Sequence, residues 1–151
     1  MAGGGNDFVL FDNREKVLPK DFSALAKKVC DRKFSIGGDG LLVLEEEPGV
    51  HFRMVYYNAD GSRAEMCGNG ARCIARFANL LKVAPARMNF QTDAGPVSAE
   101  VSEDSVKVNL GNPKDLRLDI SLKLDDQKEF NASFINSGVP HTIVLVSDVE
   151  K

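Results

Sequence analysis

The sequence has few of the features that mark secreted, zinc-binding or membrane-spanning chains. Its 151 residues include only 3 cysteines, an odd number without a Cys-x-x-Cys pair, which fits neither a disulfide framework nor a structural zinc site. No stretch approaches the roughly 18 apolar residues of a membrane span, and no basic segment followed by an apolar one opens the chain. We therefore expect a cytoplasmic protein without a membrane partner.

An excess of positive charge is also lacking. The 19 basic residues are scattered among 22 acidic ones, and the net charge is -3, whereas nucleic-acid-binding chains concentrate positive charge. We expect no nucleic-acid partner and favour small molecules as ligands. The sequence does have 43% hydrophobic residues, enough for a sizeable core.

Short apolar runs of strand length surround two segments with helical spacing. Apolar residues recur at helical spacing within 18–34, and Asp21 and Ser23 are candidate N-caps. A second helix, apolar around most of its circumference, is expected from about Gly70 to the stop at Pro85. This pattern predicts the α+β class, with mostly antiparallel strands wrapped around a central hydrophobic helix. Strands are expected at 8–11, 41–44, 52–57, 89–92, 97–101, 105–110, 116–122, 130–135 and 141–146.

The loop "MCGNG" places a thiol, Cys67, immediately before the second helix. The unpaired amide N–H groups of Gly68, Asn69 and Gly70 would point toward a ligand, and the helix dipole favours negative charge there. This field stabilises the thiolate, and the same amides can hold a carboxylate or an oxyanion. From the residues alone, a helix-capping turn with an incidental cysteine stays open as an alternative.

The other cysteines and the histidines have weaker signals. Cys30 and Cys73 are expected in the core, and Cys73 stands about 9 Å along the helix and about 240° around it from Cys67, so these two cannot pair. The thiols and histidines form no recognised metal-ligand spacing. A cysteine hydrolase would need a histidine beside Cys67, and His141 is the main candidate because His51 follows an acidic turn.

Four motifs in this order resemble the diaminopimelate epimerase family: "GNDFVLFDN", "IGGDGLLVLE", "YYNADGSRAEMCGNGARC" and "SGVPH". Members of the family have two similar domains with the active site between them, and the resemblance covers only the first half or so of a member. It implies a first epimerase domain over residues 1–112, lacking its first and last strands, and a truncated beginning of the second over 113–151, with the boundary in "LGNP". We therefore expect a fragment of a longer enzyme.

The resemblance also implies a reaction. Family members interconvert LL- and meso-diaminopimelate, on the route to lysine and peptidoglycan, without a pyridoxal cofactor or a metal. Two cysteines, one from each domain, face opposite sides of the α-carbon, where one removes a proton as thiolate and the other returns one as thiol. Cys67 matches the first-domain cysteine. The implied partners are diaminopimelate, the missing C-terminal half and, as a candidate assembly, a second copy in a homodimer; the fragment alone is expected to be inactive.

Further site residues carry over by motif. Gly68 and Asn69 match the residues whose backbone amides hold the substrate carboxylate, and Asn6 and Asn58 match side chains that contact the substrate. His141 matches the histidine that helps to set the ionisation of the thiols.

Two positions depart from the family pattern. Gly40 stands where some members carry a glutamine that contacts substrate, and Val139 stands in place of a substrate-binding asparagine, for which Asn136 is a candidate substitute. Three alternatives to the epimerase stay open: a related racemase or isomerase of the same fold, a non-catalytic carboxylate-binding domain, and the cysteine hydrolase.

Overall fold

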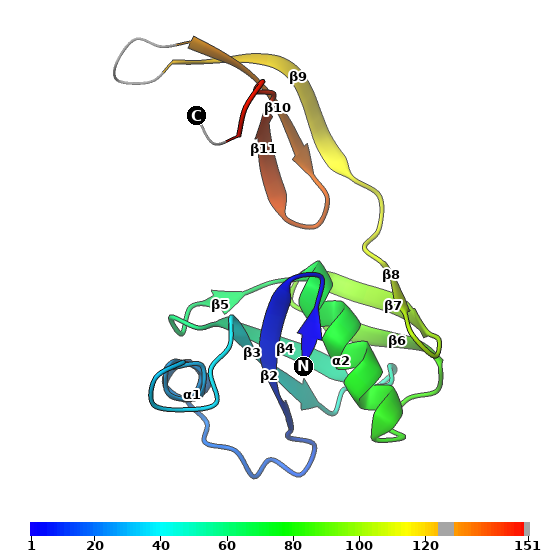
Figure 1. The fold of residues 1–151 in the computed structure, drawn as a ribbon. Helices are drawn as coiled ribbons and strands as arrows, with labels where there is room; N and C mark the ends of the chain where they lie inside the picture. The colour runs from blue at the N-terminus through cyan, green and yellow to red at the C-terminus, as the bar shows by residue number, and fades with distance from the viewer. Residues whose placement is uncertain (124–128, 150–151) are drawn as a thin grey trace. The chain divides into compact units, whose positions relative to one another are not determined.

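The chain forms two compact units, Met1–Leu110 and Gly111–Lys151, in a computed structural model that describes residues 1–123 and 129–149 (Figure 1). The first unit contains an eight-stranded sheet and two helices, and the second contains a three-stranded sheet. The α+β fold class expected from the sequence is confirmed. The domain boundary expected after residue 112 stays a prediction about the parent protein.

The sheet of the first unit is mixed. Its strand order is β1-β2-β3-β4-β6-β7-β8, with β5 paired to β4. The pairs β2–β3 and β4–β6 are parallel, and the other pairs are antiparallel. The strands are β1 (Ala2–Gly3), β2 (Asn6–Asp12), β3 (Gly40–Glu45), β4 (Arg53–Asn58), β5 (Arg63–Ala64), β6 (Arg87–Thr92), β7 (Gly95–Val101) and β8 (Val106–Asn109).

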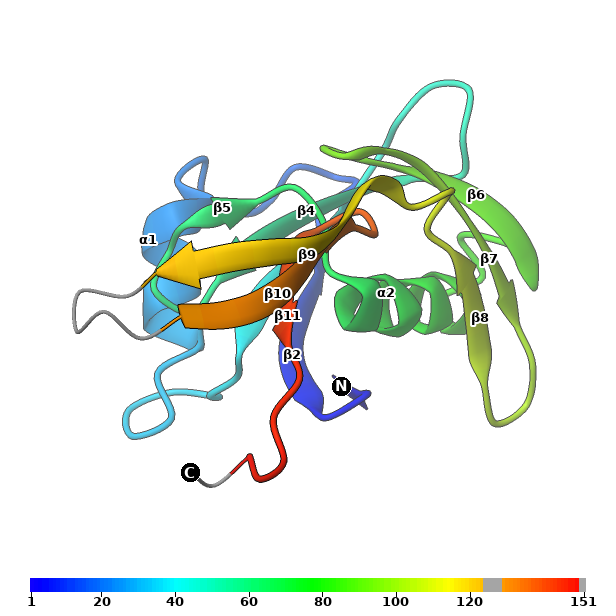
Figure 2. The same ribbon diagram turned by 90° about the horizontal axis from the view of Figure 1, so that it is seen from above.

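Helix α2 (Gly68–Leu80) packs against the concave face of this sheet, between β1 and β2 on one side and β7 and β8 on the other (Figure 2). The small residues Ala71, Ala75 and Ala78 let the helix lie close to the strands, and all three are buried. Beneath the helix, the rings of Phe52 and Phe90 are stacked with centroids 4.7 Å apart. This is the main core, which buries apolar side chains from both layers.

The far end of α2 differs from the expectation. The helix ends at Leu80, before Pro85, because Lys82 adopts a φ of 59° and the N–H of Val83 bonds back to the Ala78 carbonyl at 2.9 Å. Such a left-handed residue closes a helix without proline. Leu80 and Leu81 are 64% and 42% exposed, so the strands do not cover the last turn of this helix.

Helix α1 (Phe22–Val29) covers the opposite face of the sheet. The Asp21 carboxylate caps it by accepting from the Ala24 N–H at 3.0 Å, whereas Ser23 donates to the Gly61 carbonyl instead. The pairing of β3 with both neighbours puts its side chains between the two helices. Leu41 and Val43 consequently pack on the α1 side and Leu42 and Leu44 on the α2 side, all with no exposed surface.

The second unit is an antiparallel sheet in the order β11-β10-β9. Its strands are β9 (Lys114–Lys123), β10 (Glu129–Asn136) and β11 (Pro140–Val144). Asp115 and Asp119 have φ values of 57° and 56° where the β9–β10 register shifts, which marks bulges. Over residues 1–123 and 129–149, no helix has the length and apolar character that crossing a membrane requires.

Candidate active site

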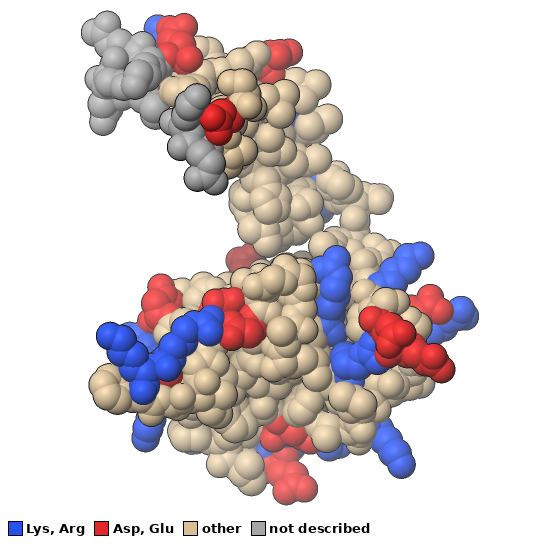
Figure 3. Space-filling model, viewed as in Figure 1, with Lys and Arg blue, Asp and Glu red and all other residues tan. Residues whose placement is uncertain are grey.

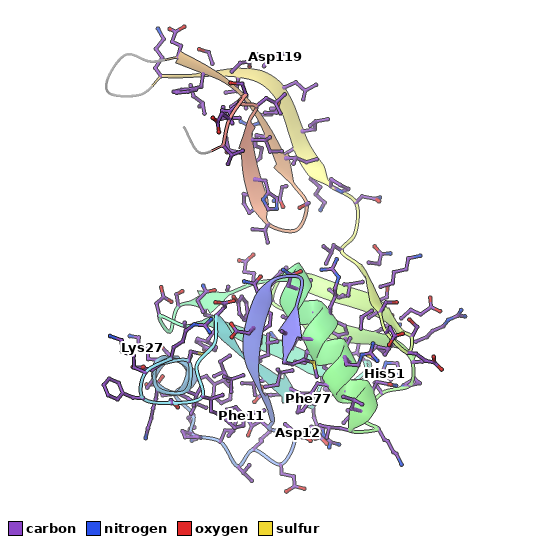
Figure 4. All side chains as sticks on the ribbon, viewed as in Figure 1. Phe11, Asp12, Lys27, His51, Phe77 and Asp119 are labelled. Carbon is purple, nitrogen blue, oxygen red and sulfur yellow. The ribbon has the colours of Figure 1, made fainter. Side chains whose placement is uncertain are left out.

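Four elements begin or end at one end of the first unit. β2 and β3 are parallel and both begin there, α2 begins there, and β4, antiparallel to β3, ends there. The register places Gly40 beside Phe8 on one side and beside Asn58 on the other. Asp12 and Phe77, labelled in Figure 4, lie toward the C-terminal ends of β2 and α2, away from this end of the unit. Residues from three of the four quoted motifs therefore meet at the start of α2.

Cys67 is the N-cap residue of α2. Its backbone is extended, with φ -146° and ψ 117°, and its Sγ accepts a hydrogen bond from the Gly70 N–H at 3.4 Å. A Cβ at position 70 would lie 3.2 Å from Leu42 Cδ2, so glycine allows the first turn to pack tightly on β3. The thiol is half-buried, and it lies where the field of the helix favours an anion.

The helix begins at Gly68, two residues earlier than expected. Two amides are left for a ligand where three were predicted, because the Gly70 N–H donates its hydrogen bond to Cys67 Sγ. The N–H groups of Gly68 and Asn69 belong to the first turn and have no intrahelical acceptor. Among the hydrogen bonds of the described residues they have no other acceptor either. The anion cradle predicted from "MCGNG" is thus a thiol with two neighbouring N–H groups.

The side chains of Asn6 and Asn69 bind each other across this end of the unit. Asn69 Nδ2 donates to Asn6 Oδ1 at 2.9 Å and to the Gly4 carbonyl at 3.1 Å, and Asn6 Nδ2 donates to Asp39 Oδ2 at 3.0 Å. Gly4 has a φ of 61°, and a Cβ there would collide with the Asn69 amide. On the other side, Arg72 Nη1 donates to Asn69 Oδ1 at 3.0 Å. The "GGGN" turn is therefore held on the start of α2.

Asn58 is held by a second chain of hydrogen bonds. Its Oδ1 accepts from the Tyr56 hydroxyl at 2.7 Å, and its Nδ2 donates to Ser62 Oγ at 2.9 Å. Ser62 in turn donates to the Asp60 carboxylate at 2.6 Å. Burial is the main cause that raises the pKa of Tyr56 to about 12, so the phenol stays protonated and remains a donor.

The space that a side chain at position 40 would need is already filled. A Cβ on Gly40 would lie 2.6 Å from Tyr56 Cε2 and 2.7 Å from the Tyr57 carbonyl oxygen. The glutamine that the family resemblance suggested for this position therefore has no room in this chain. The Tyr56 ring occupies that region of the site.

The ion pairs beside Asn6 fix the charge of two carboxylates. Arg32 donates to Asp7 at 2.6 and 2.8 Å and to Asp39 at 2.9 Å. The Arg32 guanidinium lowers the pKa of Asp7 from 3.8 to about 2, and the hydrogen bond from Asn6 is the main cause that lowers the pKa of Asp39. On the face drawn in Figure 3, acidic and basic side chains lie next to one another.

The remaining cysteines are core residues, as expected. Cys30 and Cys73 are 4% and 3% exposed, and burial raises the pKa of both thiols; all three cysteines are free. His51 is exposed, precedes β4 and bonds to the backbone of Asn89, so it lies at the end of the unit opposite the site (Figure 4). Over residues 1–123 and 129–149, no three His, Cys, Asp or Glu residues form a group that could hold a metal ion.

Three predicted or suggested site residues lie in the second unit. His141 is on β11, exposed and paired with Ile135 of β10. Asn136 is the last residue of β10 and Val139 lies in the turn that follows it, where Asn136 Oδ1 accepts from the Gly138 N–H at 3.0 Å. The carbonyl end of Asn136 is therefore used by the turn. The role expected for His141 stays a prediction.

Four residues of the site were missed by sequence reasoning: Tyr56, Asp39, Ser62 and Arg72. Asp39 lies in a quoted motif but had no feature that separated it from an ordinary turn aspartate. Tyr56 was counted only as an apolar strand residue. The alternation of side chains along β4 could have indicated Tyr56. Residues two apart in a strand share a face, so Tyr56 lies on the same face as Asn58.

The fold is similar to that of solved proteins that include a probable racemase, an epimerase and an isomerase. A phenazine biosynthesis PhzF-family protein from Bacillus anthracis aligns with a TM-score of 0.69 at 16% identity, over 99% of this chain and 53% of that one. A probable proline racemase from Agrobacterium radiobacter aligns with a TM-score of 0.67 at 12% identity, over 85% of this chain and 41% of that one. At such low identity these similarities define the fold alone.

The chain belongs to the diaminopimelate epimerase family, whose profile matches residues 1–116. It is 39% identical to the diaminopimelate epimerase of Flavobacterium psychrophilum, over 97% of this chain and 54% of that protein. The identity with the enzyme of Aquifex aeolicus is 38%, over 100% of this chain and 57% of that protein. The chain thus spans somewhat more than half the length of these relatives.

Proposed function

We propose that the chain is the first part of an isomerase that epimerises LL-diaminopimelate to meso-diaminopimelate in the cytoplasm, without pyridoxal phosphate. The observation that carries the proposal is the position of Cys67, at the N-cap of α2 beside the free N–H groups of Gly68 and Asn69. Asn6 and Asn58 lie at the same end of the unit, and each retains hydrogen-bonding capacity for a substrate.

In one direction of the proposed reaction, the Cys67 thiolate removes the α-hydrogen as a proton. The C–H bond breaks, an S–H bond forms, and the electron pair delocalises into the substrate carboxylate. The N–H groups of Gly68 and Asn69 and the dipole of α2 stabilise the charge that the carboxylate gains. A thiol from the C-terminal part of the enzyme then protonates the α-carbon from the opposite face. In the reverse direction the two thiols exchange roles.

Three residues of the second unit enter the proposal through the family pattern. We assign His141 to setting the ionisation of the thiols, and Val139 to the region of the substrate site where other members have an asparagine. Asn136 is a weaker candidate for that contact than its sequence position suggests, since its Oδ1 is bonded within the turn. Its Nδ2 group remains available to a ligand.

The alternatives make different demands on the same residues. A related racemase would use the thiol and the cradle on another amino acid, whereas a non-catalytic domain would bind a carboxylate without exchanging its α-hydrogen. The hydrolase would need a histidine in contact with the thiol, and His51 is ruled out because it lies at the far end of the unit. The family membership and the paired amides favour the epimerase.

Hydrogen exchange at the α-carbon tests the proposal. The full-length parent should incorporate deuterium from solvent into diaminopimelate, and Cys67→Ala should abolish the incorporation, measured by proton NMR of the substrate. Cys30→Ala is the matched control, because Cys30 is a free thiol buried on the α1 side of the sheet. Normal exchange by the Cys67→Ala enzyme would refute the assignment.

The 151-residue chain alone provides a second test. Because one thiol cannot serve both faces of the α-carbon, it should not convert LL-diaminopimelate to the meso isomer at a measurable rate. Turnover by the isolated chain would contradict the two-thiol mechanism.

A further inference from the structure

We propose that Asp39 and Arg72 are positioning residues that together fix the orientation of the Asn6 and Asn69 side-chain amides at the start of α2. The proposal deepens the function proposed above, because it concerns how the carboxylate cradle is kept in one arrangement. It rests on three consecutive hydrogen bonds, Asp39–Asn6, Asn6–Asn69 and Asn69–Arg72.

The order of donors and acceptors along this chain allows only one arrangement. An ionised carboxylate only accepts hydrogen bonds, a guanidinium only donates them, and a side-chain amide does both at opposite ends. Asp39 therefore requires the Nδ2 end of Asn6, so that Asn6 turns its Oδ1 toward Asn69. Asn69 must then present its own Nδ2, and its Oδ1 is left to accept from Arg72.

Rotating either amide by 180° would break the chain. It would place an N–H against an N–H or an oxygen against an oxygen at two of the three links. The orientation of an isolated asparagine amide is ambiguous, but here it follows from the groups at the two ends. The orientation of each side-chain amide therefore depends on Asp39 and Arg72, not on the asparagine itself.

The acceptor end of the chain is firmly held. Asp39 also accepts from the Asp7 N–H at 3.0 Å and from Arg32 at 2.9 Å. These donors, together with Asn6, lower the pKa of Asp39, so that it is ionised at neutral pH. Its backbone joins the other parts of the site, since its N–H donates to the Asp7 carbonyl and its carbonyl accepts from the Ala59 N–H.

The fixed orientation determines what the site offers a ligand. Both N–H bonds of Asn69 Nδ2 are used, one by Gly4 and one by Asn6, so its side chain serves the fold and its backbone N–H is left for an anion. Asn6 keeps one N–H in a direction fixed by Asp39. If Asn6 rotated, an oxygen would replace that donor, and a substrate carboxylate would be repelled where it had been bound.

Two substitutions at Arg72 distinguish a side chain that only donates hydrogen bonds from one that can also accept them. Arg72→Lys keeps a group that only donates, whereas Arg72→Gln introduces an amide that can accept as well and thereby permits Asn69 to rotate. Arg72 is exposed, so neither change should disturb the core. Asp39→Asn makes the corresponding change at the acceptor end. Arg76→Gln is the control, because Arg76 lies one turn further along α2 and donates to the carbonyls of Glu103 and Ser105.

The side-chain amide signals of Asn6 and Asn69 report orientation directly. In nitrogen–proton NMR spectra of the 151-residue chain, each should give one pair of signals in the unaltered protein, in Arg72→Lys and in Arg76→Gln. In Arg72→Gln and Asp39→Asn these signals should broaden or double, while the backbone spectrum stays folded. Single, unshifted signals in both of those variants would overturn the proposal.

Steady-state kinetics of the full-length enzyme test the consequence for the reaction. Arg72→Gln and Asp39→Asn should lower kcat/KM about tenfold, as expected for one weakened hydrogen bond to a charged group, and Arg72→Lys should largely restore it. Altered spectra with unchanged kcat/KM would refute the positioning role. If the parent fails to epimerise at all while the spectra behave as stated, the proposed function falls and the fixed orientation stands.

Discussion

Asn69 donates a hydrogen bond to Asn6 at 2.9 Å, although 63 positions of sequence separate the two residues. This contact joins the first residue of β2 to the first turn of α2 and closes one side of the candidate site. The first unit therefore assembles the cradle around Cys67 from its own residues. Properties of that half of the site can be measured on the 151-residue chain itself.

The three thiols should differ sharply in reactivity. Cys67 is half-buried at a helix N-terminus, whereas Cys30 and Cys73 are almost fully buried and burial raises their pKa values. Iodoacetamide at pH 7.5 should therefore modify Cys67 first in the folded chain, as followed by mass spectrometry of peptides. In urea all three should react. Equal rates in the folded chain would contradict the description of the site.

Two substitutions at Cys67 separate helix capping from chemistry. Cys67 Sγ accepts from the Gly70 N–H, and a serine hydroxyl can take over this role whereas alanine cannot. Cys67→Ser should therefore be more stable than Cys67→Ala by about 0.5–1 kcal/mol, measured by urea unfolding. Both variants lack the thiol and should be inactive in the parent. An alanine variant as stable as the serine variant would show that the thiol does not cap the helix.

Much of the fold could be predicted because strands and helices have local signatures. The buried run Leu41 to Leu44, the small apolar face of α2 and the thiol at its start could all be recognised in the sequence. The parallel pairing of β2 with β3 could not, since it joins strands separated by the whole of α1. The early end of α2 at Leu80 depends on one left-handed residue, Lys82, that has no local signature.

The site could be predicted only in part, for a related reason. Cys67, Gly68 and Asn69 are neighbours in one motif, so their proximity was certain. The contacts of Asp39 with Asn6, and of Tyr56 with Asn58, depend on the β2–β3–β4 register and on side-chain direction. A hydrogen-bond network between motifs becomes visible only when the sheet is assembled.

A glutamine at position 40, the residue that the family resemblance suggested, should not be tolerated in this chain. Because its Cβ would lie 2.6 Å from Tyr56 Cε2 and 2.7 Å from the Tyr57 carbonyl oxygen, Gly40→Gln should destabilise the fold by about 1–3 kcal/mol. Tyr56→Phe, which keeps the ring, should not relieve the loss. The control is Gly68→Ala, whose Cβ would be 3.4 Å from its nearest neighbour, Leu110, in ordinary contact. Urea unfolding that showed equal stability for Gly40→Gln would contradict the packing described.

The ion pairs of Arg32 should make stability depend on pH in a defined direction. The pKa of Asp7 is lowered from 3.8 to about 2, chiefly by the hydrogen bond from Arg32, and the pKa of Asp39 is lowered as well. A carboxylate whose pKa is lower in the folded state stabilises that state above its unfolded pKa. Its contribution is lost as the pH falls from about 4 toward 2.

Removing the guanidinium with Arg32→Met should therefore lower the urea midpoint at pH 7 and have a diminishing effect as the pH falls through this range. The effect should be modest and should shrink in 1 M salt, because the Arg32 side chain is 57% exposed and its pairs are screened by solvent. Arg87→Met removes an exposed arginine paired with Glu100 and reports the general cost of losing such a residue. A difference between Arg32→Met and the unaltered chain that stays constant from pH 7 to pH 3 would mean that Arg32 does not control the ionisation of Asp7 and Asp39.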